Sequence, residues 1–202
     1  SVGMAQFGLD QILPRFLQDN PGVTVVQRAS NQMEDLINSG IDVAIRGHMD
    51  TLPESSLIQV RLARLEWHLF GSPEYVDALG SVDEPAALAD QTALVLGRPR
   101  ETHQWLLTDE SGQTALVPCN VRFASDDMST LKNAAASSLG IVALPSYVCK
   151  PEVEAGTLVR ALPGWTAGTP QISILMPSKR GVLPAVEVFI ECLKQDLPKV
   201  LK

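Results

Sequence analysis

The sequence predicts an α/β protein built from two βα-rich halves, and three observations lead to this prediction. The hydrophobic period changes from that of a helix to that of a strand at Gly40. Before that point, strand and helix patterns already alternate, which is typical of a parallel sheet. The 202 residues are 45% hydrophobic and 19% charged, a balance that supports a real core and excludes a disordered chain.

The first predicted elements are a helix over 9–17, a strand over 23–29, a helix over 31–39 and a strand over 41–45. Apolar residues recur at helical spacing from Leu9 to Leu17, and Pro14 should kink that helix. Asn31 can cap the second helix, with Glu34 three residues later as in a capping box. Gly40 can supply the left-handed residue that ends it.

The strand after Gly40 places one cation at its end. Ile41, Val43 and Ile45 share one face and should pack on a core, and Arg46 follows at the carboxyl end. Ligands of open α/β sheets bind outside the carboxyl ends of strands. We therefore expect Arg46 to contact a ligand carboxylate, or alternatively to form an internal ion pair with an acid such as Asp50.

The second half alternates short strands with helices. Ser72 and Pro73 form a helix start, and Gly112 lies in a hairpin loop. The remaining predicted strands are 57–62, 65–69, 93–96, 104–107, 115–117, 121–124, 141–144 and 158–162, and the helices are 73–79, 85–89, 128–138 and 147–154. A last strand over 171–176 and a last helix from Pro184 should return to the first half. We thus expect lobes of residues 1–68 plus 169–202 and of residues 69–168.

Charge and composition exclude several classes of protein. The formal net charge is −7, and DNA binding depends on neutralising phosphates, so we expect no DNA binding by this chain alone. No apolar run approaches the length of a membrane span, and no signal peptide is evident. The three cysteines lack disulfide-framework or zinc spacing, and a reducing cytoplasm fits them best. The chain begins with Ser1, and we expect it to be a fragment of a longer protein.

Short motifs distributed over nearly the whole chain resemble one family. They are PRFL at 14–17, NPGV at 20–23, DL at 35–36, GIDVAIR at 40–46, GSPEY at 71–75, GIVALP at 140–145 and GTLV at 156–159. Each motif is weak alone, but their order and spacing resemble the effector domains of LysR-type transcriptional regulators. Two positions depart from the family pattern: Asp126 stands where Asn is common, and Ser138 where a smaller residue is common.

The resemblance implies a fold and a function. The fold would be periplasmic-binding-protein-like, type 2, with two Rossmann-like lobes and a ligand cleft between them. The function would be sensing of a small-molecule effector, an organic acid or other polar anion, by a cytoplasmic regulator. DNA would be bound only through a winged helix-turn-helix domain that precedes this chain. The chain would form a homodimer, and a higher oligomer at full length, with the helix over 8–18 against the partner's helix over 128–138.

The candidate ligand-contacting residues combine this resemblance with local patterns. The loop before the first helix can present free amides to an anion. Asn31 and Ser125 can serve as helix caps, as ligand contacts or as both, and Arg98 is either a ligand contact or a solvated arginine. The expected set is Gly3, Met4, Ala5, Asn31, Arg46, Gly97, Arg98, Ser125 and Asp126.

Two other functions compete with the regulator interpretation. A free solute-binding protein of a transporter would share the fold, but the small size and missing signal peptide argue against it. An enzyme is not expected, because no nucleophile–base or metal-ligand spacing occurs. Ser129 and Lys132 match an S-x-x-K string by chance, since its companion motifs are absent. No cofactor or metal is expected.

Overall fold

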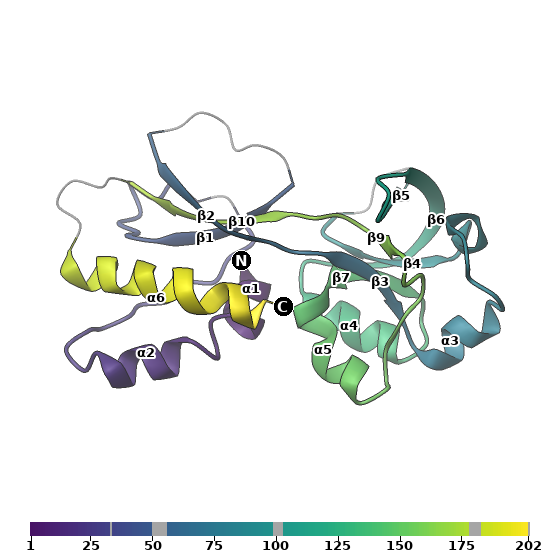
Figure 1. Ribbon diagram of the computed structural model, residues 1–202, viewed down its shortest axis with the longest axis horizontal. Helices are drawn as coiled ribbons and strands as arrows, with labels where there is room; N and C mark the ends of the chain where they lie inside the picture. The colour runs from purple at the N-terminus through teal and green to yellow at the C-terminus, as the bar shows by residue number, and fades with distance from the viewer. Residues whose placement is uncertain (33, 50–55, 99–102, 178–182, 202) are drawn as a thin grey trace. The chain divides into compact units, whose positions relative to one another are not determined.

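The computed structural model describes residues 1–32, 34–49, 56–98, 103–177 and 183–201 (Figure 1). The chain forms two compact units, and each contains its own sheet. The first unit comprises Ser1–Leu65 and Pro170–Lys202, and the second comprises Glu66–Thr169. The C-terminal strand and helix therefore belong to the first unit.

The sheet of the first unit has three strands in the order β1-β10-β2. They are β1 (Ala44–His48), β10 (Gln171–Met176) and β2 (Ile58–Arg64), and every pairing is antiparallel. Ile172 and Ile174 of the central strand are buried. The parallel sheet predicted for this half is therefore wrong for its described strands, because the returning strand β10 pairs between β1 and β2.

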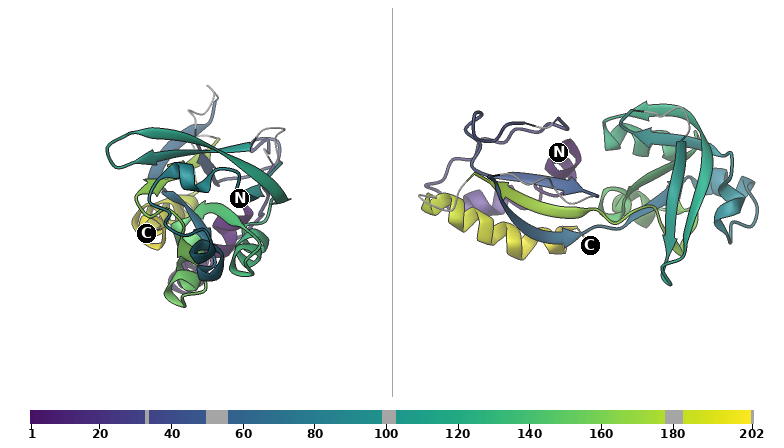
Figure 2. Two further views of the ribbon diagram at one scale, coloured as in Figure 1. Left: turned by 90° about the vertical axis from the view of Figure 1, so that its right-hand side faces the viewer. Right: turned by 90° about the horizontal axis from the view of Figure 1, so that it is seen from above.

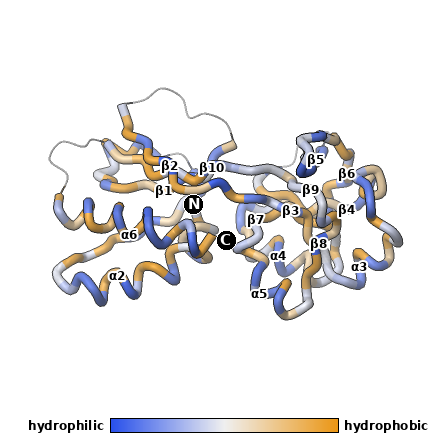
Figure 3. The backbone as a smooth tube through the Cα atoms, in the orientation of Figure 1, coloured by the Kyte–Doolittle hydropathy of each residue, from blue (hydrophilic) through white to orange (hydrophobic). Residues whose placement is uncertain are grey.

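The described residues of the first unit also form three helices. They are α1 (Val2–Phe7), α2 (Leu13–Asp19) and α6 (Pro184–Val200). Figure 3 shows α6 alternating between hydrophilic and hydrophobic residues, and its buried side includes Leu193 and Leu197. Pro14 lies in the first turn of α2, where its missing N–H needs no partner. The helix expected from residue 9 begins only at Leu13, because residues 9–12 form turns, and Pro14 therefore starts this helix and does not kink it.

Two predicted elements of the first unit do not form. Residues 23–30 have no strand partner in the described part of the chain, and Val26 is 84% exposed. The described residues of the helix expected over 31–39 form no helix, and residues 36–40 form turns. Here the Asp35 carboxylate accepts hydrogen bonds from the amides of Ile37 and Asn38, a local arrangement that competes with helical bonding. Gly40 still adopts the expected left-handed conformation, with φ of +62°.

The second unit contains a seven-stranded mixed sheet in the order β8-β3-β7-β4-β6-β5-β9. The strands are β3 (Trp67–Gly71), β4 (Thr92–Leu96), β5 (His103–Asp109), β6 (Thr114–Ser125), β7 (Ile141–Pro145), β8 (Val159–Arg160) and β9 (Trp165–Thr166). Strand β4 lies between β6 and β7 and runs parallel to both. Figure 2 shows β5 and β6 as a long two-stranded ribbon, in agreement with the predicted hairpin.

The helical segments of the second unit agree with the sequence pattern. They are α3 (Pro73–Ala78), η1 (Pro85–Leu88), α4 (Met128–Ala136) and α5 (Ser146–Glu154). Ser72 caps α3 by accepting a hydrogen bond from the Tyr75 amide, as predicted. The cap of α4 is Asp127, not Ser125. Among the helices that the structure describes, none has the length and hydrophobicity needed to cross a membrane.

Candidate functional site

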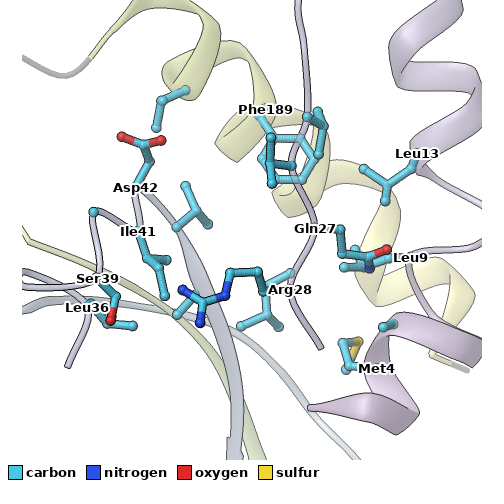
Figure 4. A pocket seen from close by; sticks show the side chains of 18 of the residues that line it. Met4, Leu9, Leu13, Gln27, Arg28, Leu36, Ser39, Ile41, Asp42 and Phe189 are labelled. Carbon is cyan, nitrogen blue, oxygen red and sulfur yellow. The ribbon is translucent and has the colours of Figure 1, made fainter. Parts of the chain in front are cut away.

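A pocket of about 530 Å³ lies within the first unit (Figure 4). Helices α1, α2 and α6 contribute residues to it, and so do the segments 23–30 and 39–46. Its volume falls in the range of pockets that bind small organic molecules. It is therefore the first unit's candidate site.

Most of the wall of this pocket is apolar. Met4 and Phe16 are each only 3% exposed, so they are fixed parts of the core as well as of the wall. The rings of Phe16 and Phe189 lie 4.9 Å apart at an interplanar angle of 58°, a favourable tilted arrangement. On the opposite side, Ile41 and Val43 are only half-buried, because the pocket leaves part of their surface uncovered.

Four charged side chains also line the pocket: Arg28, Glu34, Asp42 and Arg46. Arg28 Nη2 lies 3.4 Å from Glu34 Oε2. Arg46 Nη2 donates a 2.7 Å hydrogen bond to the carbonyl oxygen of Gln32. Asp42 is exposed. The charges are thus balanced in number, and each arginine has a protein partner.

Arg46 does not lie at the carboxyl end of a strand as predicted. It is the third residue of β1, which begins at Ala44. Strand β1 starts late because residues 41–43 form no ladder pairs. The alternative partner Asp50 lies outside the described residues. Arg46 nevertheless lines the pocket, together with the predicted residues Met4 and Ala5.

The first turn of α1 is already supplied with hydrogen-bond acceptors. The Val2 amide donates to Asn31 Oδ1 at 3.1 Å, and the Met4 amide donates to Ser1 Oγ at 3.4 Å. The Ala5 amide donates to the backbone oxygen of Ser1. Ser1 is therefore the N-cap of α1, and Asn31 accepts a hydrogen bond from the first turn of that helix. The Met4 and Ala5 amides, which were expected to be free, have partners. Gly3 is buried within the same turn.

The four predicted residues of the second unit lie together at one edge of its sheet. The Gly97 amide donates a 2.8 Å hydrogen bond to the backbone oxygen of Ser125, which joins the carboxyl ends of the parallel strands β4 and β6. Arg98 and Asp126 follow these two residues and are exposed. Ser125 Oγ accepts from the amide of Asp127 at 3.1 Å. These four residues therefore lie at the carboxyl ends of two parallel strands, where ligands of open α/β sheets bind.

Nothing among the described residues has the arrangement of a metal or thiol centre. No group of three or more His, Cys, Asp or Glu residues could hold a metal ion in that part of the chain. Burial raises the pKa of Cys119 to about 11 and that of Cys149 to about 12, so both thiols stay protonated at neutral pH. Lys132 of the S-x-x-K string is buried and pairs with Glu152 at 2.7 Å. These groups therefore serve the packing of the second unit.

The fold and the two groups of residues define an α/β ligand-binding domain, and comparison with known proteins gives its family. The model of the LysR substrate binding domain matches residues 1–198. The chain therefore belongs to the LysR substrate-binding domain family, and it has the type 2 periplasmic-binding-protein-like fold of that family.

Curated relatives support this assignment. An HTH-type transcriptional regulator of Xanthomonas campestris pv. campestris is 28% identical over 186 residues, which are 90% of this chain and 53% of the relative. The regulator PtxR of Pseudomonas aeruginosa is 28% identical over 190 residues, which are 94% of this chain and 60% of the relative. The chain thus spans about half to three-fifths of the length of these regulators.

Solved structures of regulatory domains have the same fold. The regulatory domain of AphB from Vibrio vulnificus is 27% identical and has a TM-score of 0.69, covering 92% of this chain and 89% of that domain. The CrgA regulatory domain of Neisseria meningitidis, a LysR-type regulator, has a TM-score of 0.80 at 22% identity, covering 98% of this chain and 95% of that domain.

Sequence reasoning missed several residues of the first-unit pocket. Arg28 lies in the segment predicted as a strand over 23–29, and the strand pattern gave no indication of a role for its side chain. Phe189 lies in the last helix, predicted from Pro184, but it was not among the predicted site residues. The sequence contains opposite charges at Arg28 and Glu34, six residues apart. Whether these two side chains meet depends on the turns between them, which the sequence pattern did not predict.

Proposed function

We propose that this chain is the effector-sensing and dimerisation domain of a LysR-type transcriptional regulator that acts in the cytoplasm. The family model that covers residues 1–198 is the single observation that carries the proposal. Because the chain spans only part of its relatives, DNA binding is assigned to an N-terminal winged helix-turn-helix domain of the full protein. The relatives' names as HTH-type regulators favour this role over that of a transporter's solute-binding protein.

The effector in this proposal is an organic acid or another polar anion. Arg46 supports it from the first unit, since a guanidinium can bind a carboxylate through two parallel hydrogen bonds. In the second unit, the edge at Gly97, Arg98, Ser125 and Asp126 presents both a cation and backbone groups. The negative charge of Asp126 favours a ligand that also carries a hydrogen-bond donor. That both groups serve one ligand stays a prediction.

The mechanism follows from the linkage between binding and conformation. A ligand shifts a protein toward the conformation that it binds more tightly, by no more than its difference in affinity for the two conformations. In a regulator, that shift would change the arrangement of the dimer and so of the attached DNA-binding domains. No chemical transformation of the effector is involved.

A thermal-shift screen of small organic acids tests the proposal. An acid present at 100 times its dissociation constant stabilises the folded chain by about 2.7 kcal/mol, which raises the melting temperature measurably. The matched amides of the same acids serve as controls for non-specific stabilisation. If no acid stabilises the chain more than its amide does, the proposed effector class is wrong.

A further inference from the structure

We propose that the outer face of the β5–β6 ribbon binds the same face of a second copy of this chain, with the two ribbons antiparallel. This ribbon contact has Leu106, Leu116 and Pro118 at its centre and Glu110 and Arg122 at its ends. It is separate from the expected dimer contact between α2 and the partner's α4, and it joins such dimers into larger assemblies. The inference goes beyond the proposed function, because effector binding does not require it.

The two faces of the ribbon, which Figure 2 shows, have opposite environments. On the inner face, Trp105 and its cross-strand neighbour Val117 are 5% and 1% exposed and belong to the core of the second unit. On the outer face, Leu106 and its cross-strand neighbour Leu116 are 54% and 64% exposed. The solvent face of an antiparallel sheet is normally polar. Two facing leucines there are therefore the apolar centre of a candidate contact surface.

The outer face continues along β6 to a positive charge. Side chains of a strand alternate between its faces, and the buried Val117 and Cys119 point inward. Their neighbours at even positions are all exposed and share the outer face: Thr114, Leu116, Pro118, Asn120 and Arg122. The apolar centre is thus followed by a polar residue and then by an arginine.

The tip of the ribbon carries the opposite charge on a fixed turn. Asp109 Oδ1 accepts hydrogen bonds from the amides of Ser111 and Gln113 at 2.9 and 2.8 Å. Glu110 of this turn is exposed, like Arg122. Neither Glu110 nor Arg122 forms an ion pair with the residues that the structure describes. Both charges are therefore available to a partner, and the fixed turn lowers the cost of ordering on binding.

The spacing of these charges fits a second copy of the same ribbon. Thr108 pairs with Thr114, so Glu110 lies level with position 112. Midway between that level and Arg122 is the level of residue 117, about 17 Å from each. A two-fold axis across the strands at this level places Glu110 within one strand spacing, about 4.8 Å, of the line of the partner's Arg122. An arginine side chain can span that offset.

The same axis also matches the rest of the two faces. Leu116 would lie over the partner's Pro118, and Thr114 over the partner's Asn120. An apolar centre with a polar rim is the usual composition of a protein interface. An axis along the strands would instead bring the two Glu110 side chains together, and like charges repel. The charge pattern therefore selects the antiparallel arrangement of two identical ribbons.

Small-angle X-ray scattering at increasing chain concentration measures association beyond the dimer. The apolar centre is small, so we expect a weak contact with a dissociation constant of about 0.1–1 mM. Leu106→Glu should weaken this association by at least about tenfold and leave the α2–α4 dimer intact, because it buries a charge in the ribbon contact alone. Val188→Glu on α6 is the control, since Val188 is 47% exposed but lies outside the ribbon. It should associate like the original chain.

A charge exchange tests whether the partner is a second copy. Glu110→Arg and Arg122→Glu each bring like charges together twice in every contact, so each should weaken association by about three- to tenfold. The double variant Glu110→Arg/Arg122→Glu restores opposite charges and should associate within about threefold of the original chain. An equimolar mixture of the two single variants should also recover association, because every charge pair between unlike chains is then attractive. Circular dichroism checks the fold of each variant.

Three results would overturn the inference. These are no association beyond the dimer at chain concentrations up to about 1 mM, unchanged association in Leu106→Glu, and a double variant and mixture as weak as the single variants. A different macromolecule that binds this face while the chain does not self-associate gives the first result. Because the acid screen measures effector binding separately, the failure of the ribbon contact is distinguishable from that of the proposed function.

Discussion

Arg46 has both a structural contact and a proposed ligand contact. Its hydrogen bond to Gln32 holds the turn region against β1, and the same guanidinium lines the pocket. A guanidinium carries five N–H donors, so a single backbone bond does not exhaust its capacity. The two roles are therefore compatible, but they predict different losses on substitution.

The effect of Arg46→Ala on effector binding is the first prediction. If the proposed function is right, affinity for an acid found by screening should fall by about ten- to a hundredfold, the value of a charged hydrogen bond. Arg46→Lys should recover only part of this, because the planar fork is lost. Calorimetry measures the affinity, and thermal unfolding reports the structural loss. If Arg46→Ala lowers the melting temperature but leaves the affinity for the acid unchanged, Arg46 does not contact the ligand and has only a structural role.

A buried ion pair in the second unit provides the second prediction. Lys132 Nζ lies 2.7 Å from Glu152 Oε1 and 3.2 Å from the backbone oxygen of Val148, and its side chain is only 8% exposed. Lys132→Met should destabilise the chain by about 2–3 kcal/mol, because Glu152 keeps a partly buried charge without its partner. The double variant Lys132→Met/Glu152→Met should recover much of the lost unfolding free energy, because no unpaired charge then remains.

An exposed ion pair supplies the control for this measurement. Lys194 lies 2.6 Å from Glu191 on α6, and both side chains are at least 40% exposed. Lys194→Met should change the unfolding free energy by less than about 0.5 kcal/mol. Urea unfolding measures all the variants. If Lys132→Met and Lys194→Met lower the unfolding free energy equally, burial does not make the Lys132–Glu152 pair more important for stability.

At the scale of elements, one turn of the second unit requires glycine. Gly140 lies between α4 and β7 with φ of +154°. A Cβ atom there would lie 2.6 Å from the backbone oxygen of Thr92 and 2.8 Å from its Cγ2. The backbone of β4 cannot move away easily, because it pairs with strands on both sides.

The third prediction compares two glycines. Gly140→Ala should destabilise the chain by about 3 kcal/mol or more, because backbone strain and overpacking add. Gly112→Ala is the control, since its φ is +87° but nothing lies within 4 Å of the added Cβ. Gly112→Ala should lower the unfolding free energy by about 1–2 kcal/mol, because alanine is strained at a positive φ. Chemical denaturation measures both, and a smaller loss for Gly140→Ala would contradict the close approach.

The fourth prediction concerns the pH dependence of the α4 cap. Hydrogen bonds, first of all that from Thr130 Oγ1 at 2.7 Å, hold the pKa of Asp127 below its ordinary value of 3.8. A lowered pKa in the folded state stabilises the protein above the unfolded pKa, and this contribution is lost as pH falls through the folded pKa. The stability difference between the original chain and Asp127→Asn should therefore be largest near pH 6 and shrink below about pH 4.

Urea unfolding at pH 6 and pH 3 measures this difference. Thr130→Ala should reduce the pH-dependent part, because it removes the largest cause of the lowered pKa. Asp127→Asn should keep much of the cap at both values, since Asn is also a good cap residue. A difference that grows toward low pH would contradict the assignment of the cap.

For the whole molecule, the fifth prediction is a homodimer. The expected contact joins the region of α2 with the partner's α4. Among the alanines of α4, Ala135 is fully buried within its own unit, whereas Ala134 and Ala136 are partly accessible. The contact should therefore be modest, with dissociation in the micromolar range, about −8 kcal/mol.

Sedimentation velocity over a range of concentrations tests the dimer. Leu17 of α2 is 37% exposed, and Leu17→Glu should weaken the dimer by at least about tenfold through a buried charge. Leu106 of β5 is 54% exposed and lies outside the expected contact, so Leu106→Glu is the matched control. A chain that stays monomeric at all concentrations would refute the prediction, and equal effects of the two substitutions would refute the contact.

The sequence by itself determined several local features of the second unit. The cap at Ser72, the hairpin around Gly112 and the strand before Pro145 rest on local rules, and the structure contains them. The family followed from short motifs in a fixed order, and the family match confirms it. Local patterns succeed for the cap and the hairpin because their hydrogen bonds join residues that are close in the chain.

Tertiary structure alone decided the first unit's sheet and its pocket. Whether residues 23–30 form a strand depends on a neighbour, and β10, more than 120 residues beyond β1, determines how β1 is paired. The Asp35 turn competes with a helix at little difference in free energy, so propensity could not choose between them. The positions of Arg28 and Arg46 follow from these non-local choices, because a side chain's surroundings are set by which segments pack around it.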